Sequence, residues 1–179
     1  MSANRAKTAR MDAIYAQHFD AVAAYCVRRL PMPSANDAIA ETFLTAWRRL
    51  DQVPPGEGTL PYLYRIAGNK VAHQRRGFAR QSKLRARLAT IAPDPRPGPE
   101  MQVLDHAAHR EVIDALDTLS DADREIIQLR AWEELTVPQI ADVLGISAAA
   151  AGKRIERALG RLKRTLTSGR SAAAEWGGR

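Results

Sequence analysis

Apolar side chains recur every three or four residues in the first part of the chain, with polar side chains between them. From about Met11 to Leu30, one such stripe consists of Tyr15, Phe19, Val22, Cys26 and Leu30. This spacing places the stripe on one face of an α-helix. Pro31 and Pro33 follow at once, and proline rarely continues a helix. The pattern therefore predicts a first helix that ends near residue 30.

Two more helices are predicted before residue 85. The second begins near Ser34 or Asn36, because either residue can cap a helix N-terminus, and it runs to about Leu50. Its predicted buried face consists of Ile39, Phe43, Trp47 and Leu50. Residues 51–59 (DQVPPGEGT) hold two prolines and two glycines and are predicted to be a loop. The third helix covers about residues 60–80, with an apolar side of Leu63, Ile66, Ala67 and Val71.

Alternating prolines then interrupt the pattern. They stand at positions 93, 95, 97 and 99, where they exclude a helix or a central strand and predict an extended linker. The predicted organisation is a domain over residues 11–85, a linker over 86–104, a second domain over 105–168 and a disordered tail over 169–179. The fold class is all-α, with two small helical domains joined by a flexible proline-rich linker.

The second domain is predicted to contain a helix-turn-helix. After a helix over about residues 105–119, Ser120 caps another helix, with Asp123 at the third position of a capping-box variant. Thr136 caps the next helix, Gly145 permits a tight turn, and Ser147 caps a final long helix. The final helix is predicted to bury Ala151, Ile155, Ala158, Leu162 and Leu166. Its opposite face is basic, as in a helix that enters a DNA major groove.

The charge is concentrated in two places. The formal net charge is +7 and the sequence pI about 10.1. Residues 65–87 hold eight lysines and arginines and no acid, and residues 153–170 hold seven against one acid. These two windows carry +8 and +6, so the rest of the chain carries −7. Two basic patches on an acidic protein favour a polyanionic partner.

Candidate chemistry in the first domain lies on the second and third helices. Asp37 and Glu41 are one turn apart without a cation at i+4, so they are either a favourable charge at a helix N-terminus or an acidic patch for a basic partner. On the third helix, tyrosines alternate with cations. Stacked rings and cations are what single-stranded nucleic acid requires, but the same composition fits a solvated basic helix whose tyrosines belong to the core.

Several classes of function are not supported by the sequence. The one cysteine, Cys26, lies on an apolar stripe and excludes an intramolecular disulfide. His106 and His109 are one turn apart, but no third metal ligand is evident. No nucleophile–base pair or phosphate-binding loop is apparent, so we expect no cofactor and no enzyme activity. No apolar run approaches the roughly 18 residues of a membrane span. We expect a cytoplasmic protein.

Three motifs together resemble the bacterial RNA polymerase sigma factors of the extracytoplasmic-function (ECF) type. Residues 37–48, DAIAETFLTAWR, match the family pattern D-x-x-Q-E-T-F-x-x-A-W-R. Residues 62–69, YLYRIAGN, with Arg75 and Arg76, match W-L-x-x-I-A-R-N…R-R. In the second domain, LSDADREI, QIADVLGIS and RIERA match the family's fourth region. The resemblance covers about residues 11–80 and 105–166.

The resemblance implies a role for each segment. The surface that grips core polymerase, through the clamp helices of its largest subunit, would include Asp37, Glu41, Thr42, Thr45 and Arg48. The residues that read and melt the −10 element would be Tyr62, Tyr64, Asn69, Lys70, His73, Arg75 and Arg76. The residues that read the −35 element would be Ser147, Ala149, Ala150, Lys153, Arg154, Arg157 and Arg161. Implied partners are core polymerase, including its flap, promoter DNA and an anti-sigma factor, with no membrane.

Some positions depart from the family pattern. Ala40 stands where glutamine is usual, Gly68 where arginine is usual and Glu134 where glycine is usual. These departures affect the expected promoter sequence more than the expected function. A freestanding helix-turn-helix regulator is the alternative, but it leaves the second basic patch and the acidic helix unexplained.

Overall fold

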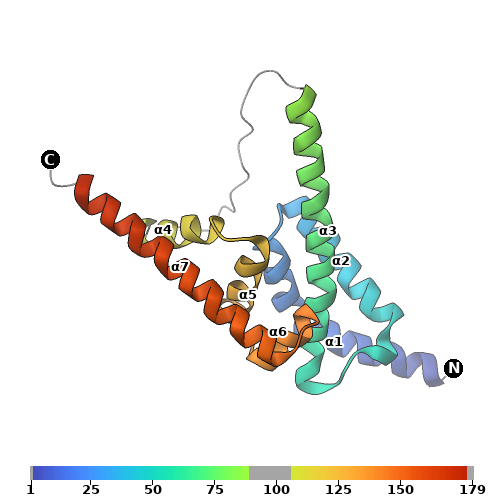
Figure 1. Ribbon diagram of the computed structural model, residues 1–179. Helices are drawn as coiled ribbons and strands as arrows, with labels where there is room; N and C mark the ends of the chain where they lie inside the picture. The colour runs from blue at the N-terminus through green and yellow to red at the C-terminus, as the bar shows by residue number, and fades with distance from the viewer. Residues whose placement is uncertain (1, 89–105, 177–179) are drawn as a thin grey trace. The chain divides into compact units, whose positions relative to one another are not determined.

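The computed structural model describes residues 2–88 and 106–176 of the chain. The chain forms two compact units, residues 1–100 and 101–179. Every regular element in the described ranges is a helix (Figure 1), which confirms the predicted all-α class with two helical domains. The predicted linker falls mainly on residues 89–105, which lie outside the described residues.

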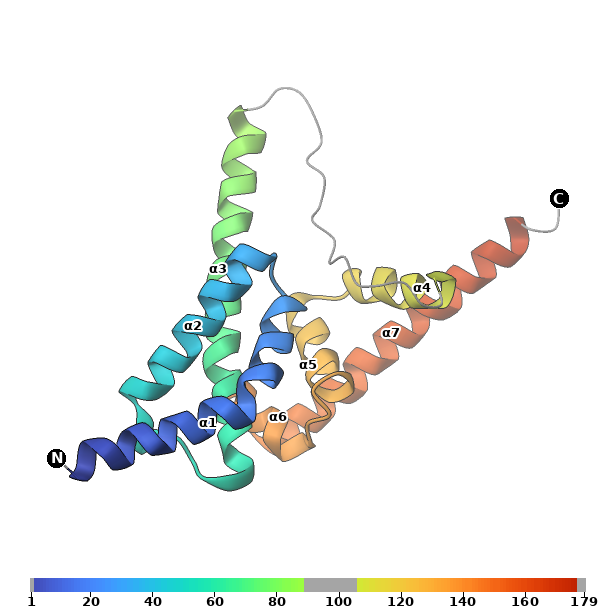
Figure 2. The same cartoon turned by 180° about the vertical axis from the view of Figure 1, so that it is seen from behind.

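The first unit contains three long helices. They are α1 (Ser2–Val27), α2 (Met32–Arg48) and α3 (Thr59–Leu88). Two short 3-10 turns, η1 (Leu50–Gln52) and η2 (Gly56–Gly58), connect α2 to α3. Each long helix packs against the other two, and Figure 2 shows α1 beside both partners. The predicted apolar side of α3 is confirmed, because Leu63, Ile66, Ala67 and Val71 are all buried.

The boundaries of these helices differ from the predictions at three points. α1 begins at Ser2, nine residues before the predicted Met11. α2 begins at Met32, so Ser34 and Asn36 are not its caps. Pro33 lies in the first turn, where its missing N–H would have had no partner within the helix. α3 continues to Leu88, past the predicted end at residue 80 and past the predicted domain boundary at residue 85.

Two aromatic side chains that the periodicity assigned to the core are exposed. Tyr15 is 47% exposed and Trp47 is 40% exposed. Phe43 is buried, as predicted, and its ring centroid lies 4.8 Å from that of Tyr15. Tyr15 therefore covers the edge of an aromatic cluster between α1 and α2, while Trp47 leaves much of its surface available. Four residues apart on α2, Phe43 and Trp47 lie on either side of the boundary between core and solvent.

The second unit contains four helices. They are α4 (His106–Asp117), α5 (Asp121–Ala131), α6 (Val137–Leu144) and α7 (Ala148–Trp176). α7 packs against α4, α5 and α6, so it is the element that holds the unit together (Figure 1). It extends through residues 169–176, where the sequence predicted a disordered tail. The run Ala172–Glu175 consists of strong helix formers, which favours this continuation.

Candidate functional site

Local hydrogen bonds build the turn between α6 and α7 as the sequence predicted. The Thr136 hydroxyl accepts from the Gln139 backbone N–H, and the Gln139 side chain accepts from the Thr136 backbone N–H at 2.9 Å. Gly145 ends α6 with φ +65°, a left-handed conformation that glycine adopts without steric cost. The Ser147 hydroxyl accepts from the Ala150 backbone N–H at 3.2 Å and begins α7. The helix-turn-helix is thereby fixed at both ends of its turn.

The residues predicted to read the −35 element divide into two sets. Ser147, Ala149 and Ala150 are exposed at the start of α7. Lys153 and Arg157 are also exposed, and no carboxylate lies within salt-bridge distance of either in the part of the chain that the structure describes. The Arg157 Nε donates to the Lys153 carbonyl at 3.3 Å, which keeps the Arg157 side chain along the helix. This set presents cations and small side chains to solvent.

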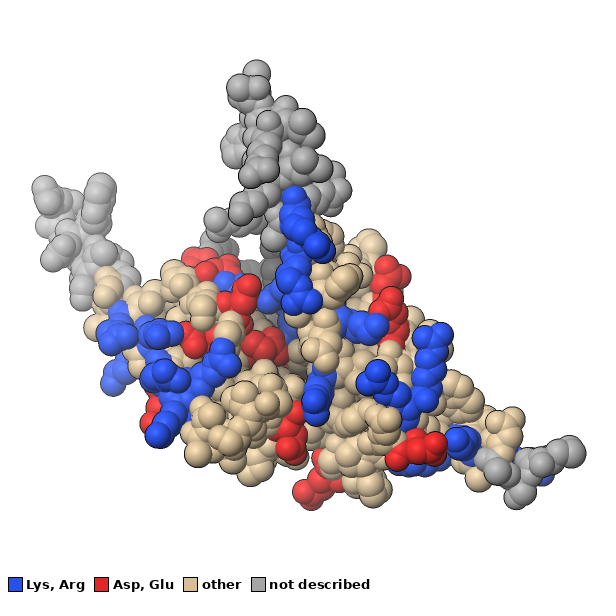
Figure 3. Space-filling view, turned by 45° about the vertical axis from the view of Figure 1, so that its right-hand side comes forward, with Lys and Arg blue, Asp and Glu red and all other residues tan. Residues whose placement is uncertain are grey.

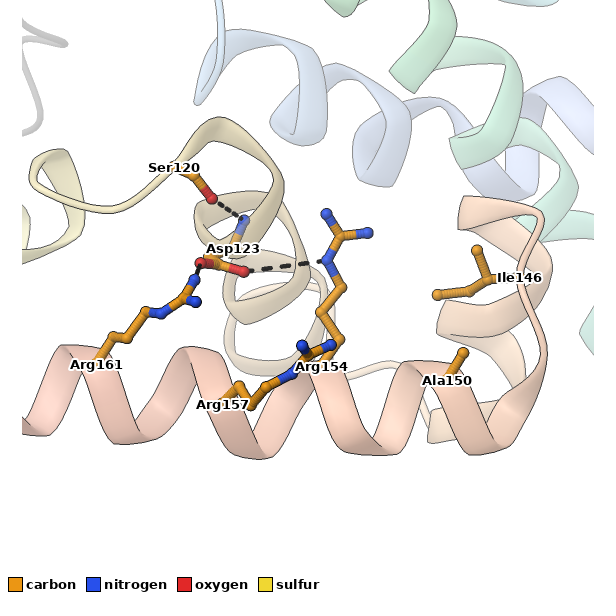
Figure 4. Close-up of a pocket in the computed structure, with 7 residues that line it drawn as sticks. All are labelled: Ser120, Asp123, Ile146, Ala150, Arg154, Arg157 and Arg161. Carbon is orange, nitrogen blue, oxygen red and sulfur yellow. Dashed lines mark hydrogen bonds and ion pairs between the residues drawn. The ribbon is translucent and has the colours of Figure 1, made fainter.

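Arg154 and Arg161 form the second set, and both are held by Asp123 of α5. Arg161 Nη1 donates a hydrogen bond to Asp123 Oδ2, and Arg154 Nε lies 4.0 Å from Asp123 Oδ1 (Figure 4). The two arginines that we expected to read the −35 element thus share a partner within the protein. The Asp123 side chain is only 8% exposed. Of the two hydrogen bonds of the predicted capping box, the structure shows the one from the Asp123 backbone to Ser120. Ser120 Oγ accepts from the Asp123 backbone N–H at 3.2 Å, while the carboxylate turns to the arginines.

These side chains line a groove of about 410 Å³ between the start of α5 and the side of α7. Its lining consists of Ser120, Asp123, Ile146, Ala150, Arg154, Arg157 and Arg161 (Figure 4).

On α3, the structure separates the two tyrosines that the sequence grouped together. Tyr64 is only 2% exposed, and its ring centroid lies 5.0 Å from that of the buried Tyr25. Its predicted role in −10 recognition is wrong, because a buried ring cannot stack on a base. Tyr62 is half-buried, so part of its ring is accessible. The interpretation of the tyrosines as core residues therefore holds for one and not for the other.

The polar face of α3 presents the remaining predicted −10 residues. Asn69, His73 and Arg76 are exposed, and Lys70 and Arg75 are partly exposed. Gly68, where the family has arginine, lies against the Tyr25 hydroxyl: a Cβ at this position would stand 3.0 Å from that oxygen. A side chain at this position would require the Tyr25 hydroxyl to shift by a few tenths of an ångström. The space that Tyr25 occupies explains why glycine fits here.

The connection from α2 to α3 is fastened to α1. Arg10 donates to the carbonyls of Leu50 at 3.0 Å and Val53 at 2.6 Å. Lys7 Nζ lies 3.1 Å from the Asp51 carboxylate. The Thr59 hydroxyl donates to the Pro54 carbonyl at 2.7 Å and closes the loop at the start of α3. Sequence reasoning missed these roles of Lys7 and Arg10, because they join residues 40 to 44 positions apart.

The predicted polymerase-binding residues of α2 do not all lie on one surface. Asp37, Glu41 and Arg48 are exposed and Thr45 is half-buried. Thr42 is fully buried, and its hydroxyl donates to the Ala38 carbonyl at 2.6 Å, so its predicted contact role is wrong. The exposed apolar side chains Leu44 and Trp47 were not predicted to be accessible.

Glu41 has no cation at i+4, as the sequence shows, but it has a cationic partner on another helix. Lys70 Nζ of α3 lies 2.7 Å from Glu41 Oε2. A residue predicted to bind polymerase and a residue predicted to bind the −10 element thus pair with each other.

The charged surfaces follow these helices. Lysine and arginine side chains form a column along α3 and a second group on α7 (Figure 3).

Within the described ranges, no three histidine, cysteine or acidic side chains are grouped so that they could hold a metal ion. None of the described helices combines the length and apolar character that crossing a membrane requires. Burial of His18 in α1 lowers the pKa of its imidazole below the ordinary value of 6.5.

Comparison with known protein families gives two matches, one in each of the two units of the structure. Residues 14–81 match the family model for sigma-70 region 2, and residues 109–162 match the model for sigma-70 region 4. The first match covers parts of α1 and α3 and the whole of α2. The second includes the helix-turn-helix.

Individual relatives agree with these matches. The chain is 31% identical to the RNA polymerase sigma factor CnrH of Cupriavidus metallidurans, over 76% of this chain and 75% of CnrH. It is 28% identical to the ECF RNA polymerase sigma factor SigK of Mycolicibacterium vanbaalenii, over 74% of this chain and 68% of SigK. The solved structure of CnrH in complex with the cytosolic domain of CnrY superimposes with a TM-score of 0.60, at 29% identity and 88% coverage of each chain.

The comparisons agree with the structure. Two region models match in the family's order, the fold is shared, and the similarity extends over most of the chain, which contains the helix-turn-helix and the two basic helices. The chain therefore belongs to the RNA polymerase sigma factors, the promoter-directing subunits of bacterial RNA polymerase, and within them to the ECF type.

Proposed function

We propose that the two units of this sigma factor divide the work of promoter recognition. The first unit binds core polymerase through α2 and engages the −10 element through α3. The second unit engages the −35 element through the first turns of α7. The observation that carries this division is the separation of the basic charge onto two exposed helix faces, one in each unit (Figure 3).

The core-binding surface of α2 combines charge with apolar area. Asp37, Glu41 and Arg48 are exposed, and Leu44 and Trp47 are 47% and 40% exposed. A large aromatic side chain with charged neighbours is typical of an interface anchor. The partner that fits this surface is a basic pair of helices, such as the clamp helices of the largest polymerase subunit. Thr45 lies half-buried at its edge.

The −10 surface of α3 consists of Tyr62, Asn69, Lys70, His73, Arg75 and Arg76. The accessible part of the Tyr62 ring can stack on an unpaired base, which contributes about 1–3 kcal/mol. The cations contact the phosphates of the opened strand. Because Arg10 fastens the preceding loop to α1, the start of α3 is held in place for this task.

The −35 surface of α7 consists of Ser147, Ala149, Ala150, Lys153 and Arg157. The alanines contact thymine methyl groups, and the two cations contact phosphates or base edges. These contacts are few, so the domain works as one of two DNA grips on a polymerase and not as a self-sufficient DNA-binding protein. The polymerase flap is the surface that holds this unit in place.

The proposal includes an anti-sigma factor and a cytoplasmic site of action. CnrH has been solved in complex with the cytosolic domain of CnrY, and this chain has the same fold over most of its length. A partner of that kind would cover the core-binding surface of α2. The protein performs no chemical step itself, since sigma factors are non-enzymatic initiation factors.

The experiment that tests the core-binding surface is a charge reversal with a matched control. Asp37→Lys should reduce the amount of core polymerase that co-purifies with the protein, because it places a cation opposite a basic partner. Asp20→Lys changes the charge equally at an exposed position of α1 and should leave co-purification at the wild-type level. Circular dichroism checks that both variants are folded. Equal core binding by the two variants would refute the assignment of this surface.

A further inference from the structure

Among the described residues, Asp123 is the only acidic residue that is buried. Its two oxygens face two different arginines of α7, Oδ2 toward Arg161 and Oδ1 toward Arg154 (Figure 4). The carboxylate comes from α5 and the arginines from a helix that begins 25 positions later. It therefore joins the helix before the helix-turn-helix to its second helix.

Helix geometry explains why Asp123 reaches these arginines and not their neighbours. In a helix of 3.6 residues per turn, Ala150, Arg154 and Arg161 lie within roughly 40° of one another around the axis. This strip borders the buried face of α7 that holds Ala151 and Ala158. Lys153 and Arg157 lie further from that border, on the side that faces solvent. The position of each α7 cation around the helix thus decides whether it faces Asp123 or solvent.

The Asp123–Arg161 pair must persist when DNA binds. A buried carboxylate that loses its cation keeps the cost of desolvation without the compensating attraction. A DNA phosphate that captured Arg161 would leave Asp123 with only the more distant Arg154, 4.0 Å away, as compensation. Arg161 therefore serves as the internal counter-ion of Asp123, although it is half exposed and was predicted to contact DNA.

Arg154 is held differently. It faces Asp123 through Nε, at 4.0 Å, and its two terminal nitrogens lie beyond Nε, away from the carboxylate (Figure 4). The terminal nitrogens are the pair of donors that recognises guanine O6 and N7 in a bidentate contact. An arginine whose side chain is already fixed loses less conformational freedom when it makes that contact. Arg154 is therefore pre-oriented for base recognition.

We propose that Asp123 is a positioning residue for promoter recognition, which retains Arg161 as an internal counter-ion and orients Arg154 to read a base in the −35 element. This inference rests on the proposed role of α7. It goes beyond that role because it assigns the sequence preference to a residue of another helix. It also removes Arg161 from the residues that the family resemblance assigned to the −35 element.

The test compares two variants that remove the same charge from the same helix. Asp123→Asn releases both arginines, whereas Asp121→Asn removes an exposed carboxylate that lies 3.9 Å from Arg124. Each variant is assembled with core polymerase. Binding is measured as a function of salt concentration on a promoter fragment that the wild-type holoenzyme selects from a randomised library.

Asp123→Asn is expected to steepen the dependence of log K on log salt by about 1 or more relative to Asp121→Asn, because each additional phosphate contact adds about 0.9 to the slope. It is also expected to weaken the preference for one −35 base pair by at least about threefold, since a bidentate contact discriminates by roughly fivefold or more. A purely structural role for Asp123 would change neither the slope nor the base preference. Equal behaviour of the two variants would overturn the proposal.

If Asp123→Asn does not fold, a second pair of variants tests whether Arg161 contacts Asp123 or DNA in the complex. Arg161→Gln should leave the salt slope unchanged, because its charge is already used within the protein. Arg157→Gln should lower the slope by about 0.9. An equal decrease in both variants would place Arg161 on the DNA and overturn the proposal. If the wild-type holoenzyme shows no −35-dependent binding, it is the proposed role of α7 that fails.

Discussion

Glu41 on α2 and Lys70 on α3 form an ion pair, with Lys70 Nζ 2.7 Å from Glu41 Oε2. The two residues lie on the surfaces that we assign to polymerase and to the −10 element. Their side chains are 55% and 34% exposed, so the pair contributes at most about 1 kcal/mol to stability. Such a weak pair can open when either residue meets a stronger partner.

A charge swap separates the structural role of this pair from its functional roles. Lys70→Glu alone should lower the melting temperature, because it places two carboxylates together. Adding Glu41→Lys should restore the melting temperature. In the double variant, both core binding and promoter opening should remain impaired, because both surfaces then carry the wrong charge. Thermal denaturation and core co-purification measure the two effects. Full recovery of core binding in the double variant would contradict the assignment of Glu41.

The two tyrosines of α3 should respond differently to truncation. Tyr64→Ala removes a buried ring that packs on Tyr25 and should reduce the free energy of unfolding by roughly 3–5 kcal/mol. Tyr62→Ala should cost much less stability but impair promoter opening. Urea denaturation gives the first quantity, and permanganate reactivity of unpaired thymines gives the second. Wild-type promoter opening by Tyr62→Ala would exclude Tyr62 as a stacking residue.

Two residues with left-handed backbone should respond to substitution with opposite signs. Glu134 has φ +54° and Gly145 has φ +65°. Arg130 and the Leu135–Leu129 backbone hydrogen bond hold the turn that contains Glu134. Glu134→Gly should raise the free energy of unfolding by about 1 kcal/mol, because it relieves this strain, and Gly145→Ala should lower it by a similar amount. Chemical denaturation checks both, and a loss of stability in Glu134→Gly would contradict the account.

The stability of the first unit should depend on the protonation of His18. Burial lowers its pKa in the folded state below 6.5, so the folded protein disfavours the imidazolium form. The stability that neutral His18 provides is present above pH 6.5 and is lost as pH falls from 6.5 through the folded-state pKa. His18→Gln should therefore lose less stability than the wild type between pH 7 and pH 5. Identical pH profiles of the two proteins in urea denaturation would refute this.

Local signals in the sequence were sufficient for the helix-turn-helix. The caps at Ser120, Thr136 and Ser147 and the turn at Gly145 depend on hydrogen bonds and backbone conformations within a few residues, and each was predicted. Glu134 was noted only as a departure from the family pattern. Its positive φ supplies a physical reason for the glycine of the family pattern.

The sequence did not predict which side chains would be accessible at the edges of the buried faces. Periodicity placed Trp47 in the core, but it is 40% exposed. The family resemblance placed Thr42 and Tyr64 on binding surfaces, but both are buried. A 3.6-residue period identifies a stripe, but the packing of neighbouring helices fixes its width. The pairs Glu41–Lys70 and Asp123–Arg161 join residues 29 and 38 positions apart, and only the tertiary fold brings them together.

The most direct test of the central claim is in vitro transcription with purified core polymerase. We expect core polymerase alone to give no specific transcript, and addition of the protein to give transcripts from a defined start site on templates that share a −10 and a −35 sequence. Scrambling either element should abolish the transcript. If a template library yields no transcript that depends on both the protein and core polymerase, the account of this chain as a promoter-directing subunit is contradicted.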